Sequence, residues 1–543
     1  MNGLMMDHPL TLTDLLQHGV RCFPDQEIVT PRAQGGPQRY RFLEFGERTE
    51  RLARALGQLG VRPGDRVATL AWNTEQHLEC YFAIPGIGAV LHTLSLRLFP
   101  DDLAFVINDA ADRIIFCDRG ALPLLQRLAG RIPSVRLVVL MGEGPADTAG
   151  LPQTIDYEQL LSESSPGMEW PALDERQAAA MCYTSGTTDL PKGVVYSHRS
   201  AYLHSLAAVT AGWIGLCFQD TLLPVVPMFH VNAWGLVHAS IGAGAKVVMP
   251  GRYLDPVHLL DQLRTEEVTV TAGVPTIWGR LLSLLDERPT PLPRLRMILC
   301  GGSAAPPALI SGFDRHGLNL VHAWGMTETS PIGTVAVVKT HLEGRNPEEL
   351  LRLRSKQGLP ILGVELRIAD LVTGNQCPPD GQTAGEIQVR GPWIARAYHH
   401  DPDDSAGRFT GDGWFRTGDV ATMDFEGYIQ IVDRTKDLVK SGGEWISSVA
   451  LEGELAAHPK VLEAAVLGFP HSRWAERPVA FVVPQPQYRE NISEEEVLEF
   501  LRHRVAAFWV PDRVIFVDEV PKTSAGKFDK KVLRRRYASF DLG

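Results

Sequence analysis

The chain has 543 residues, of which 44% are hydrophobic and 22% are charged, proportions that are typical of a globular protein and exclude a chain disordered throughout. At about 150 residues per domain, this length predicts more than one core. Lys and Arg total 53 against 64 Asp and Glu, and the resulting net charge of −11 argues against a general nucleic-acid-binding protein.

Short β-branched runs alternate with amphipathic stretches before residue 433. The helical pattern of residues 255–264 follows one such run and precedes another. This alternation predicts an α/β fold with mostly parallel sheets. The runs that predict strands are 66–72, 113–118, 136–142, 245–251 and 296–302.

The pattern changes near residue 433. Apolar runs at 464–470 and 478–484 predict strands, and Ser493 with Glu496 forms a capping box that opens an amphipathic helix. A further strand and a basic tail follow. The sequence therefore predicts a large multi-subdomain N-terminal body, residues 1–433, and a small mobile α+β domain, residues 434–543.

Targeting and membrane signals are absent from the sequence. The seven cysteines are scattered and never paired as Cys-x-x-Cys, which predicts a reducing, cytoplasmic compartment. The first 19 residues lack the pattern of a secretory signal. Residues 221–245 carry no charge, but Pro224, Pro227 and His230 interrupt them, so we expect a buried strand, loop and helix and no integral membrane segment.

The strongest local motif is YTSGTTDLPKG, residues 183–193. Small hydroxyl residues around a glycine let backbone N–H groups approach phosphate oxygens, and Lys192 adds a positive charge. The motif is not a Walker A loop, because Pro191-Lys192-Gly193 stands where Gly-Lys-Ser/Thr is required. It predicts a phosphate-binding loop, with a plain polar turn as the alternative. The candidate contacts are Thr184, Ser185, Gly186, Thr187, Thr188 and Lys192.

Further motifs follow in order along the chain: PMFHVNAWG (227–235), GGSAAP (301–306), WGMTET (324–329), GWFRTGD (413–419), DRTKD (433–437), SGGEWIS (441–447) and PKTSAGK (521–527). Together with residues 183–193 they resemble the signature of the adenylate-forming superfamily, which includes acyl-CoA synthetases, firefly luciferase and peptide-synthetase adenylation domains. The resemblance covers nearly the whole chain and is closest to medium- and long-chain fatty acid–CoA ligases.

The resemblance implies a site for ATP and AMP. Trp324 would lie against adenine, Thr327 would contact the α-phosphate, and Asp419 would accept the ribose hydroxyls. Glu328 and Thr184 would hold Mg²⁺, a hard ion suited to oxygen ligands. The other implied nucleotide contacts are Gly301, Gly302, Ser303, Gly325, Met326, Arg434 and Lys440. Residues 301–303 follow a buried strand and are not a nucleophile elbow, because position 305 is Ala305.

The C-terminal motifs imply catalytic and CoA-binding residues. Lys527 matches the family's catalytic lysine, which would stabilise charge between the attacking carboxylate and the α-phosphate alongside Lys192, Thr327 and Glu328. Asp433 and Lys436 match the hinge, although residues 433–437 alone could equally be a charged linker. The implied CoA-binding residues are Ser441, Gly442, Gly443 and Glu444.

The implied reaction activates a carboxylic acid as acyl-AMP with release of pyrophosphate and then transfers the acyl group to the CoA thiol. Between Asp220 and Lys246 no carboxylate is available to pair with an α-ammonium group, which disfavours an amino-acid substrate. His230, Val231, Asn232 and Trp234 would line the acyl site, although Trp234 could be a plain core residue. A medium- or long-chain acid is expected, with a short acid such as 3-(methylthio)propionate as an alternative.

Asp189 departs from the family, which has glycine at this position of the loop. A carboxylate near the triphosphate should weaken ATP binding, while aspartate tolerates a positive φ, so the loop is expected to be foldable but impaired. Two further alternatives follow: a ligase that loads a carrier protein, and an impaired nucleotide-binding homologue. Nothing singles out luciferase-type oxygenation. A homodimer is expected from the resemblance alone.

Overall fold

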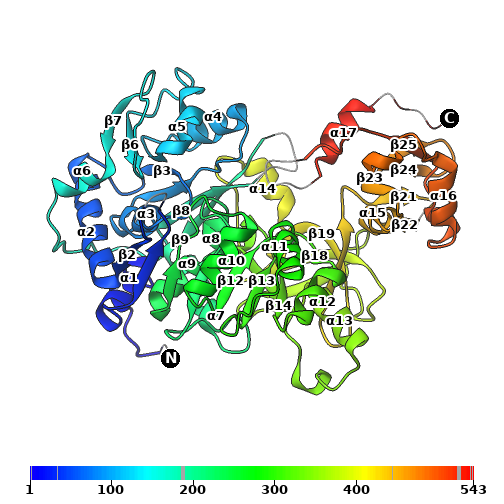
Figure 1. Cartoon of the computed structure of the whole chain (residues 1–543), viewed down its shortest axis with the longest axis horizontal. Helices are drawn as coiled ribbons and strands as arrows, with labels where there is room; N and C mark the ends of the chain where they lie inside the picture. Colours follow the sequence, from blue (N-terminus) through cyan, green and yellow to red (C-terminus); the bar gives the residue numbers. More distant parts are fainter. Residues whose placement is uncertain are drawn as a thin grey trace. The chain divides into compact units, whose positions relative to one another are not determined.

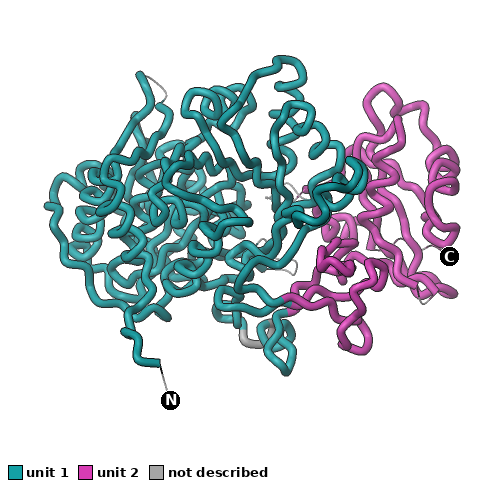
Figure 2. Tube along the Cα trace, turned by 90° about the horizontal axis from the view of Figure 1, so that it is seen from below, with its two compact units in different colours: residues 1–365, 389–415 teal, residues 366–388, 416–543 magenta. Residues whose placement is uncertain are grey.

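The computed structural model describes residues 1, 3–32, 35–184, 190–442, 444–522, 528–538, 540 and 542, with the backbone alone at 402–404. The chain divides into two compact units (Figure 2). Unit 1 comprises residues 1–365 and 389–415, and unit 2 comprises residues 366–388 and 416–543. This division differs from the functional boundary at residue 433, which stays a prediction.

One sheet of unit 1 is parallel except for its last pair of strands, which is antiparallel. Three of its strands fall within runs predicted from the sequence, and all their residues except the half-buried Arg66 are buried. In spatial order the described strands are β7 (Gln153–Asp156), β6 (Leu137–Met141), β5 (Ile114–Asp118), β3 (Arg66–Leu70), β4 (Val90–Thr93), β8 (Ala178–Tyr183) and β9 (Gly193–Ser197).

A second sheet of unit 1 has a parallel centre with antiparallel strands at both edges. In spatial order its described strands are β16 (Leu359–Pro360), β15 (Ile332–Val335), β14 (Leu320–Gly325), β13 (Met297–Cys300), β12 (Val270–Gly273), β10 (Thr221–Pro224), β11 (Lys246–Val248), β1 (Glu27–Thr30) and β2 (Gln38–Arg41). The prediction of α/β folding with mostly parallel sheets is confirmed.

The helices of unit 1 supply the apolar faces that bury these sheets (Figure 1). For example, Leu263, Trp278 and Phe313 pack on strand residue Ile298 in one core. The described helices are α1 (Leu12–Cys22), α2 (Phe42–Gln58), α3 (Glu75–Gly86), α4 (Pro100–Asp109), α5 (Leu122–Gln126), α6 (Tyr157–Ser162), α7 (His198–Val209), α8 (Val231–Trp234), α9 (Leu236–Ala243), α10 (Pro256–Thr265), α11 (Pro275–Glu287), α12 (Pro307–Arg315), α13 (Pro347–Ser355) and α14 (Pro402–Arg408).

The uncharged residues 221–245 form β10, α8 and α9, as expected for a buried strand, loop and helix. Among the described helices, none combines the length and apolar character that crossing a membrane requires. Single 3₁₀ turns lie at Arg119–Ala121, Thr327–Thr329, Thr340–Leu342, Pro486–Tyr488 and Ala507–Trp509.

Unit 2 carries most of one sheet, β17 (Glu365–Ala369), β18 (Gly385–Arg390), β19 (Phe415–Met423) and β20 (Ile429–Arg434), and a second sheet, β22 (Glu444–Ile446), β21 (Val439–Ser441), β24 (Ala475–Pro484), β23 (Val461–His471) and β25 (Arg513–Phe516). Its helices are α15 (Ser448–Ala456), α16 (Glu494–Arg502) and α17 (Lys530–Arg536). Ser493 caps α16 by accepting the Glu496 N–H at 3.2 Å, which is one half of the predicted capping box. The Glu496 carboxylate instead lies 2.8 Å from Lys460 Nζ.

Candidate nucleotide and acyl site

Three of the predicted motifs of unit 1 lie at one edge of the second sheet. Residues 225–235 follow β10, residues 301–303 follow β13 and residues 326–328 follow β14, all at the carboxyl ends of parallel strands. Open α/β sheets bind ligands at this edge. Direct packing joins two of these motifs, because a Cβ added at Gly301 would lie 3.1 Å from the Trp234 ring.

The phosphate motif connects the antiparallel strands β8 and β9. The Thr184 N–H donates to the Lys192 carbonyl at 2.8 Å, and the Lys192 N–H donates to Thr184 Oγ1 at 3.3 Å. The two ends of the motif are therefore held together as a hairpin, whereas a Walker A loop leads from a strand into a helix. The predicted contacts Ser185, Gly186, Thr187 and Thr188, and the departure Asp189, lie outside the described residues.

Tyr398 lies between two predicted catalytic groups. Its hydroxyl donates to Oε1 of the buried Glu328 at 2.6 Å, and Lys192 Nζ lies 5.3 Å from the centroid of its ring. Lys192 Nζ also lies 3.9 Å from Asp401 Oδ2. Tyr398 could not be predicted from the sequence, because no recognised motif surrounds it. The structure thus brings Lys192 and Glu328 to one place through a residue that sequence reasoning missed.

The turn around Trp324 and Glu328 is closely packed. Trp324 is buried with its ring against β15, since a Cβ added at Gly333 would lie 2.6 Å from it. Gly325 has no room for a side chain, because a Cβ there would lie 1.8 Å from the Pro331 carbonyl oxygen. The Thr327 carbonyl accepts the Tyr196 hydroxyl at 2.8 Å. The packing fixes the backbone of residues 324–328, and contact between Trp324 and adenine stays a prediction.

The predicted acyl residues form an unusual backbone element. In α8 the φ angles of Val231, Asn232, Ala233 and Trp234 are 46°, 52°, 50° and 57°, so this turn is left-handed. Such a conformation costs roughly 1–2 kcal/mol per residue, and strained backbone of this kind often occurs at functional sites. Val231, Asn232 and Trp234 are buried, whereas His230 is exposed.

Buried polar contacts hold this segment in place. The Asn73 side chain donates to the carbonyls of Pro224 and Val226 at 2.8 and 2.9 Å and accepts the Met228 N–H at 2.7 Å. Asn232 Oδ1 accepts the Cys182 thiol at 3.3 Å. Because the three contacts of Asn73 join segments more than 100 residues apart, sequence reasoning had no local signal for this residue.

The unit 2 residues Asp419 and Arg434 face each other on β19 and β20. Arg434 Nε lies 3.1 Å from Asp419 Oδ1, and the Asp419 N–H donates to Thr417 Oγ1 at 3.1 Å. Two groups predicted to contact the nucleotide are therefore neighbours. A ribose hydroxyl that donates to the same carboxylate would share it with this guanidinium.

The predicted hinge residue Asp433 lies on β20, and its side chain caps the start of a helix. It is buried, and its Oδ2 accepts the N–H groups of Ser448 and Val449 at the start of α15 at 2.5 and 3.4 Å. Burial raises the pKa of Asp433. Desolvation lowers the pKa of Lys436 to about 8. The structure therefore gives Asp433 a capping role that the sequence did not predict, and the hinge role stays a prediction.

Strands β21 and β22 pair antiparallel, with Ser441 opposite Glu444. Gly442 has φ +61°, and a Cβ there would lie 2.8 Å from the Trp474 ring, so this position requires glycine. Lys440 Nζ lies 5.4 Å from the Trp445 ring centroid. Gly443 and the catalytic candidate Lys527 lie outside the described residues.

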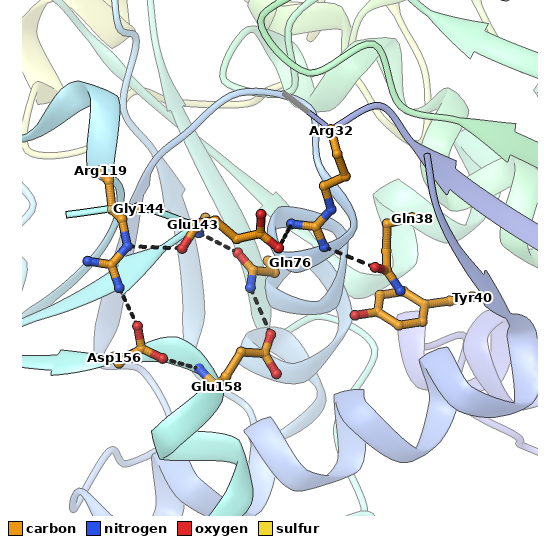
Figure 3. Close-up of a pocket in the computed structure, with 10 residues that line it drawn as sticks. Arg32, Gln38, Tyr40, Gln76, Arg119, Glu143, Gly144, Asp156 and Glu158 are labelled. Atoms are coloured by element: carbon orange, nitrogen blue, oxygen red, sulfur yellow. Dashed lines mark hydrogen bonds and ion pairs between the residues drawn. The ribbon is translucent and has the colours of Figure 1, made fainter. Parts of the chain in front are cut away.

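A separate pocket of about 420 Å³ in unit 1 has mutually paired charges (Figure 3). Arg119 pairs with Asp156, and Arg32 Nη1 lies 3.0 Å from Glu143 Oε1. None of the predicted site residues that the structure describes lines it. The lining residues are Arg32, Gln38, Tyr40, Gln76, Arg119, Gly142, Glu143, Gly144, Asp156 and Glu158.

The sheets, the phosphate hairpin and the Lys192–Tyr398–Glu328 arrangement define an enzyme of the adenylate-forming superfamily. The chain belongs to the family of AMP-binding enzymes: the family's sequence profile matches residues 16–399, and the profile of its C-terminal domain matches residues 450–527.

Relatives cover the chain almost completely. A long-chain-fatty-acid–CoA ligase of Thermus thermophilus is 46% identical over 99% of this chain and 97% of its own. A 3-methylmercaptopropionyl-CoA ligase of Ruegeria lacuscaerulensis is 44% identical over 99% of both chains. A medium-chain-fatty-acid–CoA ligase of Ectopseudomonas oleovorans is 42% identical over 100% of this chain and 98% of its own. The crystal structure of the anthranilate CoA ligase AuaEII with anthranoyl-AMP superposes with a TM-score of 0.83 at 26% identity, covering 98% of each chain.

Proposed function

We propose that the chain is an ATP-dependent, AMP-forming fatty acid–CoA ligase. The observation that carries this proposal is the pairing of Lys192 and Glu328 about Tyr398, at the sheet edge where the buried, uncharged residues 231–234 also lie. Ionic groups for a nucleotide and an apolar surface for an acyl chain are thus available in one unit.

In the first half-reaction, a carboxylate oxygen of the acid attacks the α-phosphorus of ATP and expels pyrophosphate, which leaves acyl-AMP. The positive charge of Lys192 would stabilise the negative charge of the phosphates, and the Thr327 hydroxyl would orient the α-phosphate. Lys527 would stabilise the charge that develops between the acid and the phosphorus. Thr184, Ser185, Gly186, Thr187 and Thr188 would surround the other phosphates.

A magnesium ion fits the donor set of Glu328. Its buried carboxylate keeps one oxygen on the Tyr398 hydroxyl, and hard oxygen ligands suit Mg²⁺. Glu328 and Thr184 would hold the ion, which when bound neutralises phosphate charge. Tyr398 would orient the carboxylate toward it.

In the second half-reaction, the CoA thiol loses its proton and attacks the acyl carbonyl, and AMP leaves. The pantetheine arm would be bordered by Ser441, Gly442, Gly443 and Glu444. At Gly442 there is room for a backbone but not for a side chain. Residues 1–433 would carry the ATP and acyl sites, and residues 434–543 would carry the CoA loop and Lys527. The hinge residues Asp433 and Lys436 would lie at the boundary between the two.

Two substrate classes have support. The buried residues Val231, Asn232 and Trp234 favour a medium- or long-chain acid, as do relatives named for such acids at 42–46% identity. The 44% identity to a 3-methylmercaptopropionyl-CoA ligase favours a short thioether acid as the second candidate.

A panel of linear acids from acetate to stearate with 3-(methylthio)propionate separates these classes. Each acid is given with ATP and Mg²⁺, and AMP is measured with and without CoA. We expect the highest CoA-dependent kcat/KM on a medium- or long-chain acid. AMP formation that needs a carrier protein, or no pyrophosphate release with any acid, would overturn the proposal.

Asp189 provides a second test. Because its carboxylate repels the triphosphate, Asp189→Gly should lower the KM for ATP by about tenfold, and Asp189→Asn should lower it less. An unchanged KM in both variants would show that the carboxylate faces away from the nucleotide.

A cytoplasmic homodimer completes the proposal. All seven cysteines are free thiols, which supports a reducing compartment. The dimer rests on the family resemblance, and sedimentation velocity would test it.

A further inference from the structure

Two adjacent histidines and an aspartate lie together in unit 1, outside the predicted site residues. Asp109 ends α4, and His399 and His400 lie shortly before α14. One potential ligand atom of each residue lies within 4.8 Å of the other two. The mechanism proposed above uses none of these three side chains.

The backbone turns both imidazoles to the same side. Successive side chains of an extended chain point in opposite directions, but His400 has φ +53°, and the two rings stack with centroids 3.7 Å apart. His400 Nδ1 lies 3.6 Å from Asp109 Oδ1. His399 Nε2 is buried and has no hydrogen-bond partner among the described residues. A buried, unpartnered ring nitrogen is costly unless a ligand satisfies it.

The chemical nature of the three side chains indicates which metal ion they would bind. Two imidazoles with one carboxylate suit zinc, cobalt or nickel, whereas Mg²⁺ prefers oxygen donors alone. Tetrahedral zinc needs ligand atoms about 3.4 Å apart. The largely exposed His400 side chain can rotate to close the remaining gap.

We propose that Asp109, His399 and His400 bind a divalent transition-metal ion, zinc in particular. Three protein ligands leave a fourth position for water or another oxygen ligand.

The location connects this metal site to the nucleotide site. The Asp109 carboxylate also accepts the Tyr183 hydroxyl, and the His399 N–H donates to the Gly193 carbonyl at 2.8 Å. Tyr183 and Gly193 are the paired residues that begin and end the phosphate motif. Tyr398, next to His399, holds Glu328. Metal binding should therefore restrain the segment that positions both sides of the phosphate hairpin.

The test is metal binding by the full chain without nucleotide. We choose a Cys22→Ser background, because Cys22 Sγ lies 3.8 Å from His18 Nδ1 and could bind zinc separately. After treatment with a chelator, the protein is dialysed against micromolar Zn²⁺, and Co²⁺ is added in parallel to record its visible absorption. Hydrogen exchange of residues 396–401 is measured with and without Zn²⁺.

The variants keep the local structure while removing ligands. His399→Gln preserves a polar side chain, and His400→Asn tolerates the positive φ. The matched control is His503→Ala, which removes an exposed histidine that lies 3.0 Å from Glu499. Circular dichroism checks that each variant is folded.

We expect one Zn²⁺ per chain, a tetrahedral Co²⁺ spectrum and slower exchange of residues 396–401. Either ligand substitution should weaken binding by at least about tenfold, while the control stays unchanged. Absence of binding at micromolar Zn²⁺, or equal affinity in the His399→Gln/His400→Asn double variant, would overturn the proposal. These readouts do not require the ligase activity, so they can fail or succeed independently of it.

Discussion

At the scale of single residues, the candidate site depends on polar contacts that orient its charged groups. Tyr398 is a positioning residue, because its hydroxyl holds the Glu328 carboxylate at 2.6 Å. Asn73 acts similarly on the backbone before the acyl segment through three hydrogen bonds. Neither belongs to a recognised motif, and both act across long sequence separations. The sequence alone predicted the charged groups themselves, but their supports require the fold.

Tyr398→Phe should slow acid-dependent pyrophosphate exchange by about tenfold or more, because a hydrogen bond to a buried charge contributes about 1.5–3 kcal/mol. The KM for Mg²⁺ should rise, which a merely structural role would not change. Tyr253→Phe serves as the control, since that ring packs on His258. Exchange rates within twofold of the unsubstituted enzyme would argue against the positioning role.

Trp234→Ala should shift the preferred acid toward longer chains, because removing the buried indole leaves volume beside the acyl segment. Each methylene accommodated contributes about 0.8 kcal/mol, or about fourfold in kcat/KM. The acid panel measures the shift, with Trp213→Ala as the control. A uniform loss across all chain lengths would instead indicate a plain core residue.

At the scale of elements, the sequence predicted regular structure well and irregular structure poorly. Buried strands such as β5 and β13 follow from apolar runs, because burial on both faces requires such runs. The left-handed turn of α8 could not be predicted, because Val231 and Trp234 disfavour a positive φ in isolation. Surrounding packing and the contacts of Asn73 and Asn232 impose it.

A second element-scale feature is the buried charge cluster beneath α15. Lys530 Nζ lies 2.7 Å from both Glu452 Oε1 and Ser448 Oγ, and Ser448 Oγ donates to Asp433 Oδ1 at 3.2 Å. Burial raises the pKa of both Asp433 and Glu452. Lys530 is therefore the cation that offsets two buried carboxylates.

Lys530→Met should destabilise unit 2 by about 3 kcal/mol near pH 8, because it leaves buried carboxylates without their cation. A carboxyl group whose folded pKa is raised destabilises the fold only when ionised, so the loss should fade as the pH falls toward about 5. Hydrogen exchange of the α15 amides measures this loss of stability. The control is Arg536→Met, which lies on α17 with Lys530. An equal loss at both pH values would contradict the electrostatic cause.

At the scale of the whole molecule, the adenylate-forming class and the mostly parallel α/β architecture could be predicted from motifs in register. The division into units could not, because it depends on contacts between segments far apart in sequence. Residues 366–388 belong to unit 2 although residues 389–415 return to unit 1. The amino-acid composition does not change at the points where the chain passes from one unit to the other.

The separation of the two half-reactions is a whole-molecule prediction. Lys527→Ala should reduce acyl-AMP formation by at least about a hundredfold, because its charge would act at the α-phosphate, and it should leave CoA-dependent turnover of supplied acyl-AMP nearly intact. Rapid-quench assays of each half measure this. Lys522→Ala, whose amine pairs with Glu463, is the control. Equal losses in both halves would refute the role assigned to Lys527.

The discontinuity of the two units also constrains how the chain folds during its synthesis. Residues 366–388 leave the ribosome before unit 1 has received its last segment, 389–415, and before most of unit 2 exists. During that interval β17 and most of β18 await strand β19, which lies next to β18 in the sheet, and the incomplete sheet exposes unpaired backbone groups. The nascent protein is therefore most vulnerable to misassembly and to capture by chaperones over this stretch of translation.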